Sequence, residues 1–156
     1  MDVVDKSTRS RMMAGIKAKE TKPEILIRKA LHKEGFRYRL HNSNLPGKPD
    51  LVFPRYRAVV FVHGCFWHKH GCHLFKWPST RKDFWKQKIE SNAARDQRNV
   101  EDLEEAGWKV LRLWECSIKG KFRRPIEEVV ATAANWLQFD TESAELAGTD
   151  VQHYGT

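Results

Sequence analysis

The sequence predicts a mixed α/β fold, in which helices flank a sheet. Two segments rich in strand formers, LPGKPDLVF and AVVFVHG, stand on either side of the short segment PRYR, which is the pattern of a β-hairpin. Segments with helical periodicity alternate with this hairpin and with one further apolar strand, so the expected order is helix, hairpin, helix, strand, helix. A chain of 156 residues can bury a core of its own within one such domain.

The first helix is expected to begin after Thr21, because Thr-Lys-Pro-Glu fits a capping box with Thr21 as the N-cap. Gly35 is a candidate C-cap for this helix. Glu24 shares a helix face with Ile27 and Leu31, so its carboxylate either only caps the helix or points into the protein. The sequence leaves these two roles of Glu24 open.

The hairpin is expected to turn near Arg55-Tyr56, after a weaker strand at residues 36–40. Folding the chain about this turn places Asp50 opposite Phe61 or Val62, with an uncertainty of one residue in the register. The second strand then leads into the segment HGCFWHKHGC.

A long helix is expected from Ser79 or Thr80 as the cap to Gly107 as the end. Residues 108–114 are apolar at positions on both faces, which is typical of a central strand. Pro125 lies in the first turn of a last helix.

Charge is distributed unevenly along the chain. The net charge is +8, but residues 140–156 hold four acidic and no Lys or Arg residues. The first 139 residues therefore carry 28 basic against 16 acidic residues, a net +12, which favours either a polyanionic partner such as nucleic acid or simply a solvated basic surface. We expect residues 1–20 to form a basic arm, residues 21–139 the folded domain, and residues 140–156 a flexible, dispensable acidic tail.

No apolar run approaches the roughly 20 residues of a membrane span, and the basic start of the chain lacks the apolar segment of a secretory signal. Three cysteines are an odd number, and two of them lie beside histidines, which favours metal ligation in a reducing compartment over disulfides. The expected location is the cytoplasm.

Cysteine and histidine residues suggest a metal site. Cys65, His70, Cys72 and the distant Cys116 make a Cys3His set of the kind that structural zinc prefers. The spacing alone leaves His68 or His73 as alternatives for the fourth ligand. Because all three cysteines fall near expected strand ends and two of them enclose histidines, zinc is favoured over three unrelated thiols in a histidine-rich loop.

Two carboxylates are candidates for catalysis. Asp50 begins a strand after Pro-Gly-Lys-Pro, where it could hold Mg2+ for phosphodiester cleavage or serve only as a turn residue. Asp96 lies within an otherwise apolar helical stripe that includes Trp85 and Ile89, so it needs a partner, and an imidazolium is the expected one. A neighbouring stripe has no acid and suits phosphates and base edges: Lys88, Asn92, Arg95 and Asn99.

Nearly all of residues 2–138 resemble the very short patch repair (Vsr) endonucleases, which nick DNA at T:G mismatches. The motifs that carry the resemblance are DKSTRSRMM, LPGKPDLVF, FVHGCFWHKHGC, LFKWP, TRKDFWKQKIESNAARDQRN and GWKVLRLWEC. The resemblance implies a restriction-endonuclease-like core, although the acid-x-Lys motif usual in that superfamily is absent and His63 stands in its region.

The resemblance also implies roles for the candidate residues. Asp50 and the backbone carbonyl of Val62 would hold the catalytic Mg2+. His63 and His68 would be the catalytic histidines, with His68 as the general acid or base. The carboxylates that orient them would be Glu24 and Asp96. The structural Zn2+ would be bound by the four residues Cys65, His70, Cys72 and Cys116.

Aromatic residues match the rings that this family inserts between base pairs from the major groove: Phe66, Trp67 and Trp85. Unstacking is least costly at a mismatch, so such a wedge favours damaged DNA. The simpler interpretation is that these rings belong to the core. From the arm, Met12 or Met13 would reach the opposite groove.

The sequence therefore predicts a Mg2+-dependent endonuclease that nicks one strand of double-stranded DNA beside a T:G mismatch left by 5-methylcytosine deamination. A monomer is expected, with mismatch-repair proteins as candidate further partners and no membrane association. The alternative is a zinc-stabilised DNA-binding module without catalysis, which would have no use for Asp50 and His68 together.

Overall fold

The computed structural model describes residues 21–150 of the chain. Its centre is a five-stranded sheet in the order β1-β2-β3-β4-β5. The strands are β1 (Arg39–Leu40), β2 (Leu51–Phe53), β3 (Ala58–His63), β4 (Lys109–Trp114) and β5 (Ala144–Leu146). The helices are α2 (Lys22–Lys33), α3 (Lys82–Glu105) and α4 (Ile126–Phe139). The mixed α/β fold predicted from the sequence is confirmed.

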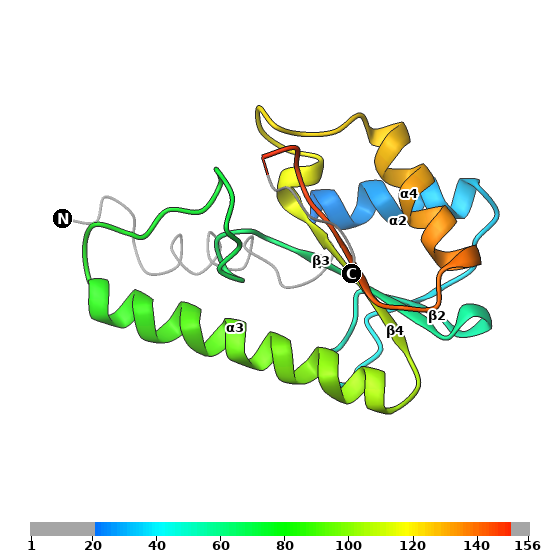
Figure 1. The fold of residues 1–156 in the computed structure, drawn as a ribbon, viewed down its shortest axis with the longest axis horizontal. Helices are drawn as coiled ribbons and strands as arrows, with labels where there is room; N and C mark the ends of the chain where they lie inside the picture. The colour runs from blue at the N-terminus through cyan, green and yellow to red at the C-terminus, as the bar shows by residue number, and fades with distance from the viewer. Residues whose placement is uncertain (1–20, 151–156) are drawn as a thin grey trace, which may run out of the picture.

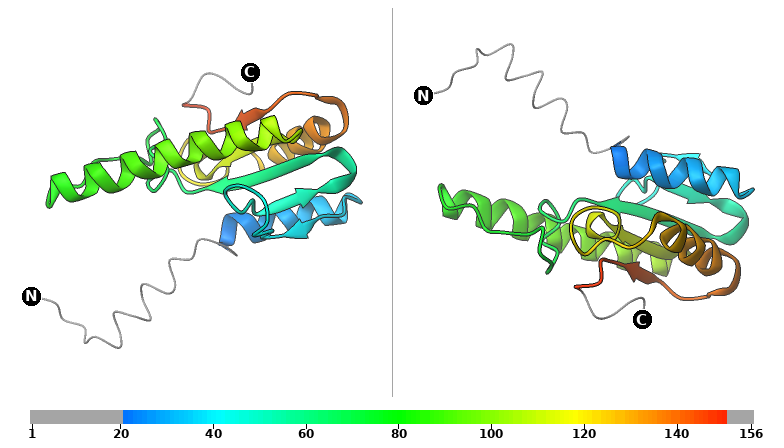
Figure 2. Two further views of the ribbon diagram at one scale, coloured as in Figure 1. Left: turned by 90° about the horizontal axis from the view of Figure 1, so that it is seen from below. Right: turned by 90° about the horizontal axis from the view of Figure 1, so that it is seen from above.

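Helices cover both faces of the sheet, with α2 and α4 on one side and α3 on the other (Figures 1 and 2). Alternating strand side chains supply the two apolar layers. Leu51, Val60 and Leu111 pack in the core beneath α2 and α4. Val52 and Val59 pack with residues of α3 on the opposite face. The sheet is therefore buried on both sides.

The hairpin has the predicted register. Leu51 pairs with Val60 and Phe53 with Ala58, which sets Asp50 opposite Phe61. The turn is a short 3-10 helix, Pro54–Tyr56, followed by Arg57 in the left-handed conformation. Strand β4 runs parallel to β3 and lies between β3 and β5, so it is a central strand, as predicted.

Helix α2 begins as predicted, because the Thr21 hydroxyl accepts a hydrogen bond from the Glu24 backbone N–H. The prediction for the start of α3 was wrong. Neither Ser79 nor Thr80 is the N-cap: the helix begins after Arg81, which has a left-handed backbone and provides no side-chain cap. The N-terminal half of α3 projects beyond the sheet (Figure 1).

The prediction of a flexible acidic tail was wrong for the part of it that the structure describes. Residues 144–146 form β5, which pairs in parallel with β4, and Leu146 and Ala147 are buried. Glu145 accepts a hydrogen bond from the Trp114 indole and lies 3.4 Å from Arg112, so an acid of this segment pairs with donors of β4. Residues 1–20 and 151–156, including the predicted arm, lie outside the described residues.

Candidate active site and metal centre

The candidate functional residues gather where β3 and β4 end. Because these two strands are parallel, His63 at the end of β3 and Trp114 at the end of β4 are register partners. The segment after β3 carries Cys65 to Cys72, and Cys116 follows β4. Strand β2 is antiparallel to β3, so its first residues, next to Asp50, lie at the same end of the sheet as the end of β3.

Asp50 and Glu24 form a carboxylate pair at this end of the sheet. Their side chains are almost fully buried, with Asp50 7% and Glu24 1% exposed. The Asp50 Oδ2 atom accepts a hydrogen bond of 2.7 Å from the Val62 backbone N–H. Glu24 Oε2 accepts one of 2.9 Å from Arg28, one turn along α2, and lies 2.8 Å from Nε2 of His41.

The pKa of Asp50 is raised to about 7, mainly by burial and also by the neighbouring carboxylate of Glu24, while the hydrogen bond from the Val62 N–H opposes the shift. Two carboxylates in a poorly solvated place resist being ionised together. A divalent cation between them would remove this repulsion, and oxygen donors of this kind are the ligands that Mg2+ prefers.

His63, His68 and Asp96 form a second cluster beside the first. The Nδ1 atom of His68 lies 2.5 Å from Oδ2 of Asp96. Asp96, the charged residue in the apolar stripe of α3, therefore has the imidazole partner that the sequence predicted. The rings of His63 and His68 stack with centroids 3.8 Å apart and planes 7° apart. These three residues could also hold a metal, since their ligand atoms lie within 4.8 Å of one another.

The two histidines of this cluster differ in solvation. His63 is 6% exposed, and its Nδ1 atom has no hydrogen-bond partner among the described residues. Burial holds the pKa of His63 well below its ordinary value, and the neighbouring His68 lowers it further, so His63 is neutral near pH 7. His68 is half-buried and bound to a carboxylate, which makes it the better placed of the two to exchange a proton with a substrate.

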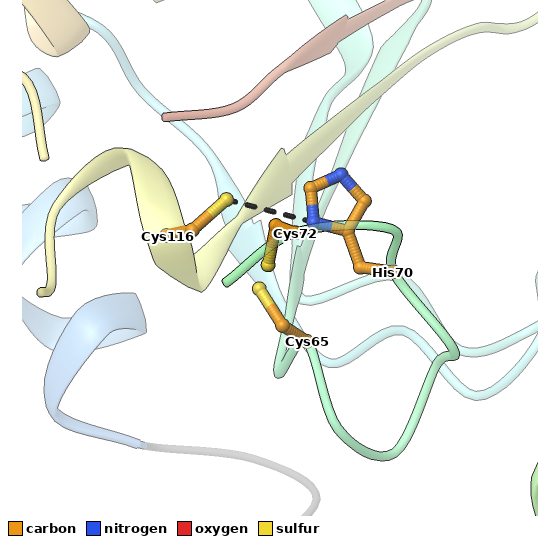
Figure 3. A group of neighbouring side chains, drawn as sticks. All are labelled: Cys65, His70, Cys72 and Cys116. Atoms are coloured by element: carbon orange, nitrogen blue, oxygen red, sulfur yellow. Dashed lines mark hydrogen bonds between the residues drawn. The ribbon is translucent and has the colours of Figure 1, made fainter. Parts of the chain in front are cut away.

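Four predicted zinc ligands converge in a third cluster (Figure 3). One ligand atom from each of Cys65, His70, Cys72 and Cys116 lies within 4.8 Å of the other three. Cys65 and Cys116 are fully buried, and Cys116 Sγ lies 3.5 Å from His70 Nδ1. Three thiols and one imidazole fit a closed tetrahedral Zn2+ site.

The histidines that the spacing left as alternative ligands have other partners. His68 binds Asp96, and His73 Nδ1 lies 2.9 Å from Asp150 Oδ2, which also accepts a bond from the His73 backbone N–H. His70 is the histidine among the cysteines, and its ring stacks on Trp114 with centroids 4.0 Å apart.

The thiols of this cluster differ in pKa. The pKa of Cys116 is lowered to about 4, mainly by a hydrogen bond from Cys65 and also by His70 and the Gly148 backbone N–H, against the effect of burial. The pKa of Cys65 is raised, first because it donates that bond and then by burial. One sulfur therefore carries negative charge without a metal, which is the form that binds zinc.

The three predicted wedge rings make one aromatic cluster between the loop and α3. Phe66 lies 5.1 Å from Trp67 and 5.6 Å from Trp85, and the two Trp rings are 5.8 Å apart, all as centroid distances. All three are half-buried. They lie beside the first turns of α3, outside the sheet core.

The stripe of α3 that was predicted to bind DNA contains two basic residues and two asparagines. Lys88 and Arg95 are exposed, as a DNA contact requires. The Asn92 amide donates to the Trp67 carbonyl at 3.1 Å, and Asn99 packs on Gly47, where an added Cβ would lie 2.9 Å from its amide nitrogen. Asn92 therefore supports the wedge loop, and its contact with DNA stays a prediction. Met13 lies outside the described residues.

Sequence reasoning missed two residues of these clusters. His41 follows β1 and meets Glu24, although nothing in its local pattern suggested it. Asp150 fell within the segment predicted as a tail, and the short alternation of Ala144 to Leu146 was the only sign that this segment joins the sheet. The predicted partner of Glu24 was a catalytic histidine, but the histidine that hydrogen-bonds to Glu24 is His41. The catalytic candidate His68 hydrogen-bonds to Asp96 instead.

Comparison with known proteins places these sites in a family. Residues 1–74 match the model of the family described as DNA mismatch endonuclease Vsr. The protein of that name from Escherichia coli (strain K12) is 41% identical over 145 residues, which cover 93% of each chain. Two proteins described as type II nicking enzymes are also similar. V.XorIIP from Xanthomonas oryzae pv. oryzae is 47% identical over 117 residues, or 75% of this chain and 86% of the relative. V.NmeAIP from Neisseria meningitidis serogroup A is 48% identical over 120 residues, or 77% and 86%.

A relative of this identity that spans almost the whole chain decides the assignment. The chain belongs to the DNA mismatch endonuclease Vsr family.

Proposed function

We propose that this protein is a Mg2+-dependent endonuclease that nicks one strand of double-stranded DNA next to a T:G mismatch left by deamination of 5-methylcytosine. The observation that carries the proposal is the position of a buried carboxylate pair, Asp50 and Glu24, at the same end of the sheet as the His68–Asp96 pair. The mixed sheet flanked by helices is the restriction-endonuclease-like core of this family, which supports a nuclease over a DNA-binding module without catalysis.

The carboxylate pair would hold the cation. Asp50, with Glu24 beside it and the Val62 carbonyl as the further predicted ligand, offers hard oxygen donors at the head of β2. A bound Mg2+ would polarise the scissile phosphate and lower the pKa of a water molecule. Asp50 must be ionised to bind it, and its pKa of about 7 means that the cation competes with a proton for this site.

His68 would move the proton. Because the Asp96 carboxylate can only accept, Nδ1 of a neutral His68 carries the hydrogen in this pair, and Nε2 is left to take a proton from the attacking water. Asp96 then stabilises the charged ring that forms. His63 stacks on the His68 imidazole and, being neutral, adds little opposing charge.

The aromatic cluster would recognise the mismatch. Phe66 and Trp67 leave the chain immediately before His68, so a base step opened by these rings would lie close to the catalytic imidazole. The Cys3His set would bind a structural Zn2+ that fixes this loop, because four protein ligands leave no open position for substrate. Exposed Lys88 and Arg95 would bind phosphates along α3.

The protein would act as a monomer on the nucleoid in the bacterial cytoplasm, with mismatch-repair proteins as candidate partners. Its described helices include none long and apolar enough to cross a membrane.

Nicking of labelled duplexes tests the proposal. Wild-type protein with Mg2+ should nick a duplex with one T:G pair in a sequence that a cytosine-5 methyltransferase recognises. It should leave the matched T:A and C:G duplexes intact. Asp50→Ala should abolish nicking while retaining DNA affinity, because basic contacts dominate binding. Binding without nicking by the wild type on every T:G sequence tested would favour the binding module instead.

A further inference from the structure

His41 joins the candidate catalytic carboxylates to the edge of the sheet. It follows directly after β1, and its backbone N–H donates to the carbonyl of Asp50 at 3.1 Å. Its Nε2 atom lies 2.8 Å from Glu24 Oε2. Since a carboxylate only accepts, Nε2 carries the hydrogen of this bond. One residue therefore contacts both members of the carboxylate pair, Asp50 through its backbone and Glu24 through its ring.

The backbone of His41 is in the left-handed region, with φ of 47°. Non-glycine residues adopt this conformation infrequently, and Asn, Asp and His are the side chains enriched in it. The conformation ends the extended run of Arg39 and Leu40, both exposed, and His41 itself is half-buried against Glu24.

Arg28 and His41 both hydrogen-bond to Glu24, but they differ in what they can hold in place. Arg28 is one turn further along α2, so its bond moves with the helix that carries Glu24. His41 comes from the sheet edge, where its backbone pairs with Asp50. Only a bond of the second kind sets the position of Glu24 relative to Asp50, which lies on a different element.

We propose that His41 is a positioning residue for the catalytic cation: its imidazole holds the Glu24 carboxylate beside Asp50, so that the two carboxylates act on one divalent cation. The proposal rests on the proposed function, since it assigns the cation to Asp50. Residues that hydrogen-bond to a metal-binding carboxylate typically change metal affinity by about 10–100-fold when they are replaced.

The test variant is His41→Asn. Asparagine accepts the left-handed backbone, so the turn after β1 is kept, but its side chain is too short to reach Glu24. His41→Gln is the rescue variant, because its longer side chain carries an N–H donor. The matched control is His32→Asn, which replaces an exposed histidine of α2.

The first measurement is Mn2+ binding to the DNA-free protein, followed by electron paramagnetic resonance of the free ion. His41→Asn should weaken Mn2+ binding about tenfold or more, His41→Gln by less, and His32→Asn not at all. The second measurement is nicking of the T:G duplex against Mg2+ concentration. For His41→Asn the half-saturating Mg2+ concentration should rise by a similar factor, with a rate at saturating Mg2+ close to that of the wild type.

Mn2+ affinity and Mg2+ dependence of His41→Asn within about twofold of the wild type would overturn the positioning role. Loss of zinc and a lower Tm in both His41 variants would also overturn it, because the residue would then support the fold. A wild type that neither binds Mn2+ nor nicks overturns the proposed function itself, which separates the two failures.

Discussion

Asp96, in the middle of α3, lies 2.5 Å from the imidazole of His68 in the loop after β3. The same helix supports that loop at Asn92, whose amide donates to the carbonyl of Trp67. One rigid element therefore holds both the ring predicted to open the DNA and the ring predicted to move the proton.

Asp96→Asn should keep the loop in place and lose the charge that selects the His68 tautomer. We expect single-turnover nicking to slow by about 10²–10⁴-fold, the usual contribution of a positioned acid-base group, with DNA affinity unchanged. A rate within a few-fold of the wild type at saturating Mg2+ would show that His68 does not act through Asp96.

Trp67→Ala should separate base opening from chemistry. Loss of one stacked ring costs on the order of 1–3 kcal/mol and leaves the metal site intact, so nicking should fall most on the T:G duplex and less on a duplex already gapped or unpaired at that step. His68→Ala should instead stop cleavage of all these substrates. Equal losses for Trp67→Ala on every duplex would assign the ring to the fold.

Cys116→Ser should destabilise the protein, because the sulfur that is most readily ionised belongs to this residue. We expect the wild type to contain about one zinc ion per chain, and the variant to lose zinc and unfold at a lower temperature. Elemental analysis with thermal unfolding checks both. A stable, active wild type without zinc would refute the metal site.

Deletion of residues 144–156 should destabilise the domain, contrary to the expectation from composition. It removes β5, the burial of Leu146 and the Asp150 contacts of His73. We expect the free energy of unfolding to fall by about 3 kcal/mol or more, on the scale of one large buried side chain. Deletion of residues 151–156 alone is the control. Equal stability of the two truncated proteins would contradict the role of β5.

Asp50 should make stability depend on pH. Its pKa is raised to about 7, so the folded protein binds this proton more tightly than the unfolded chain does. The resulting stabilisation, up to about 4 kcal/mol, is complete below about pH 4 and is lost as pH rises through about 7.

Asp50→Asn removes that ionisation. Without added divalent cation, the Tm of the variant relative to the wild type should therefore rise between about pH 5 and about pH 8. His63, whose lowered pKa acts in the opposite direction, is common to both proteins and cancels in the difference. Added Mg2+ should raise the Tm of the wild type near pH 8 but not that of the variant. A constant difference across this range would contradict the raised pKa.

Local patterns were sufficient for much of the site. The hairpin register follows from strand alternation about a turn, which predicted Phe61 or Val62 opposite Asp50, and the structure has Phe61 there. Asp96 was recognisable because a charged residue stood in an apolar stripe, and the structure gives it the imidazole partner that such burial requires. These inferences depend on the period of one element at a time.

Contacts between distant segments were not recognisable in the same way. His41 acts through a left-handed backbone after a two-residue strand, where sequence periodicity carries almost no information. Strand β5 has only three residues and lies in an acidic segment, so the composition gave no sign of it. Two acids of this segment nevertheless have partners: Glu145 pairs with Trp114 and Arg112, and Asp150 pairs with His73. The N-cap position of α3 is Arg81, whose side chain provides no cap, so no capping pattern marks this helix start.

The last described residues of the chain close its metal loop. The Gly148 N–H donates to the Cys116 sulfur, and Asp150 binds both the backbone and the ring of His73. During synthesis the amino-terminal parts of a domain emerge first. A nascent chain that ends before residue 144 already contains each predicted catalytic residue and zinc ligand, but not the contacts that Gly148 and Asp150 make with Cys116 and His73. The ribosome must therefore finish this segment before the loop beside the predicted nuclease centre is complete, so prematurely terminated chains should be poor nucleases.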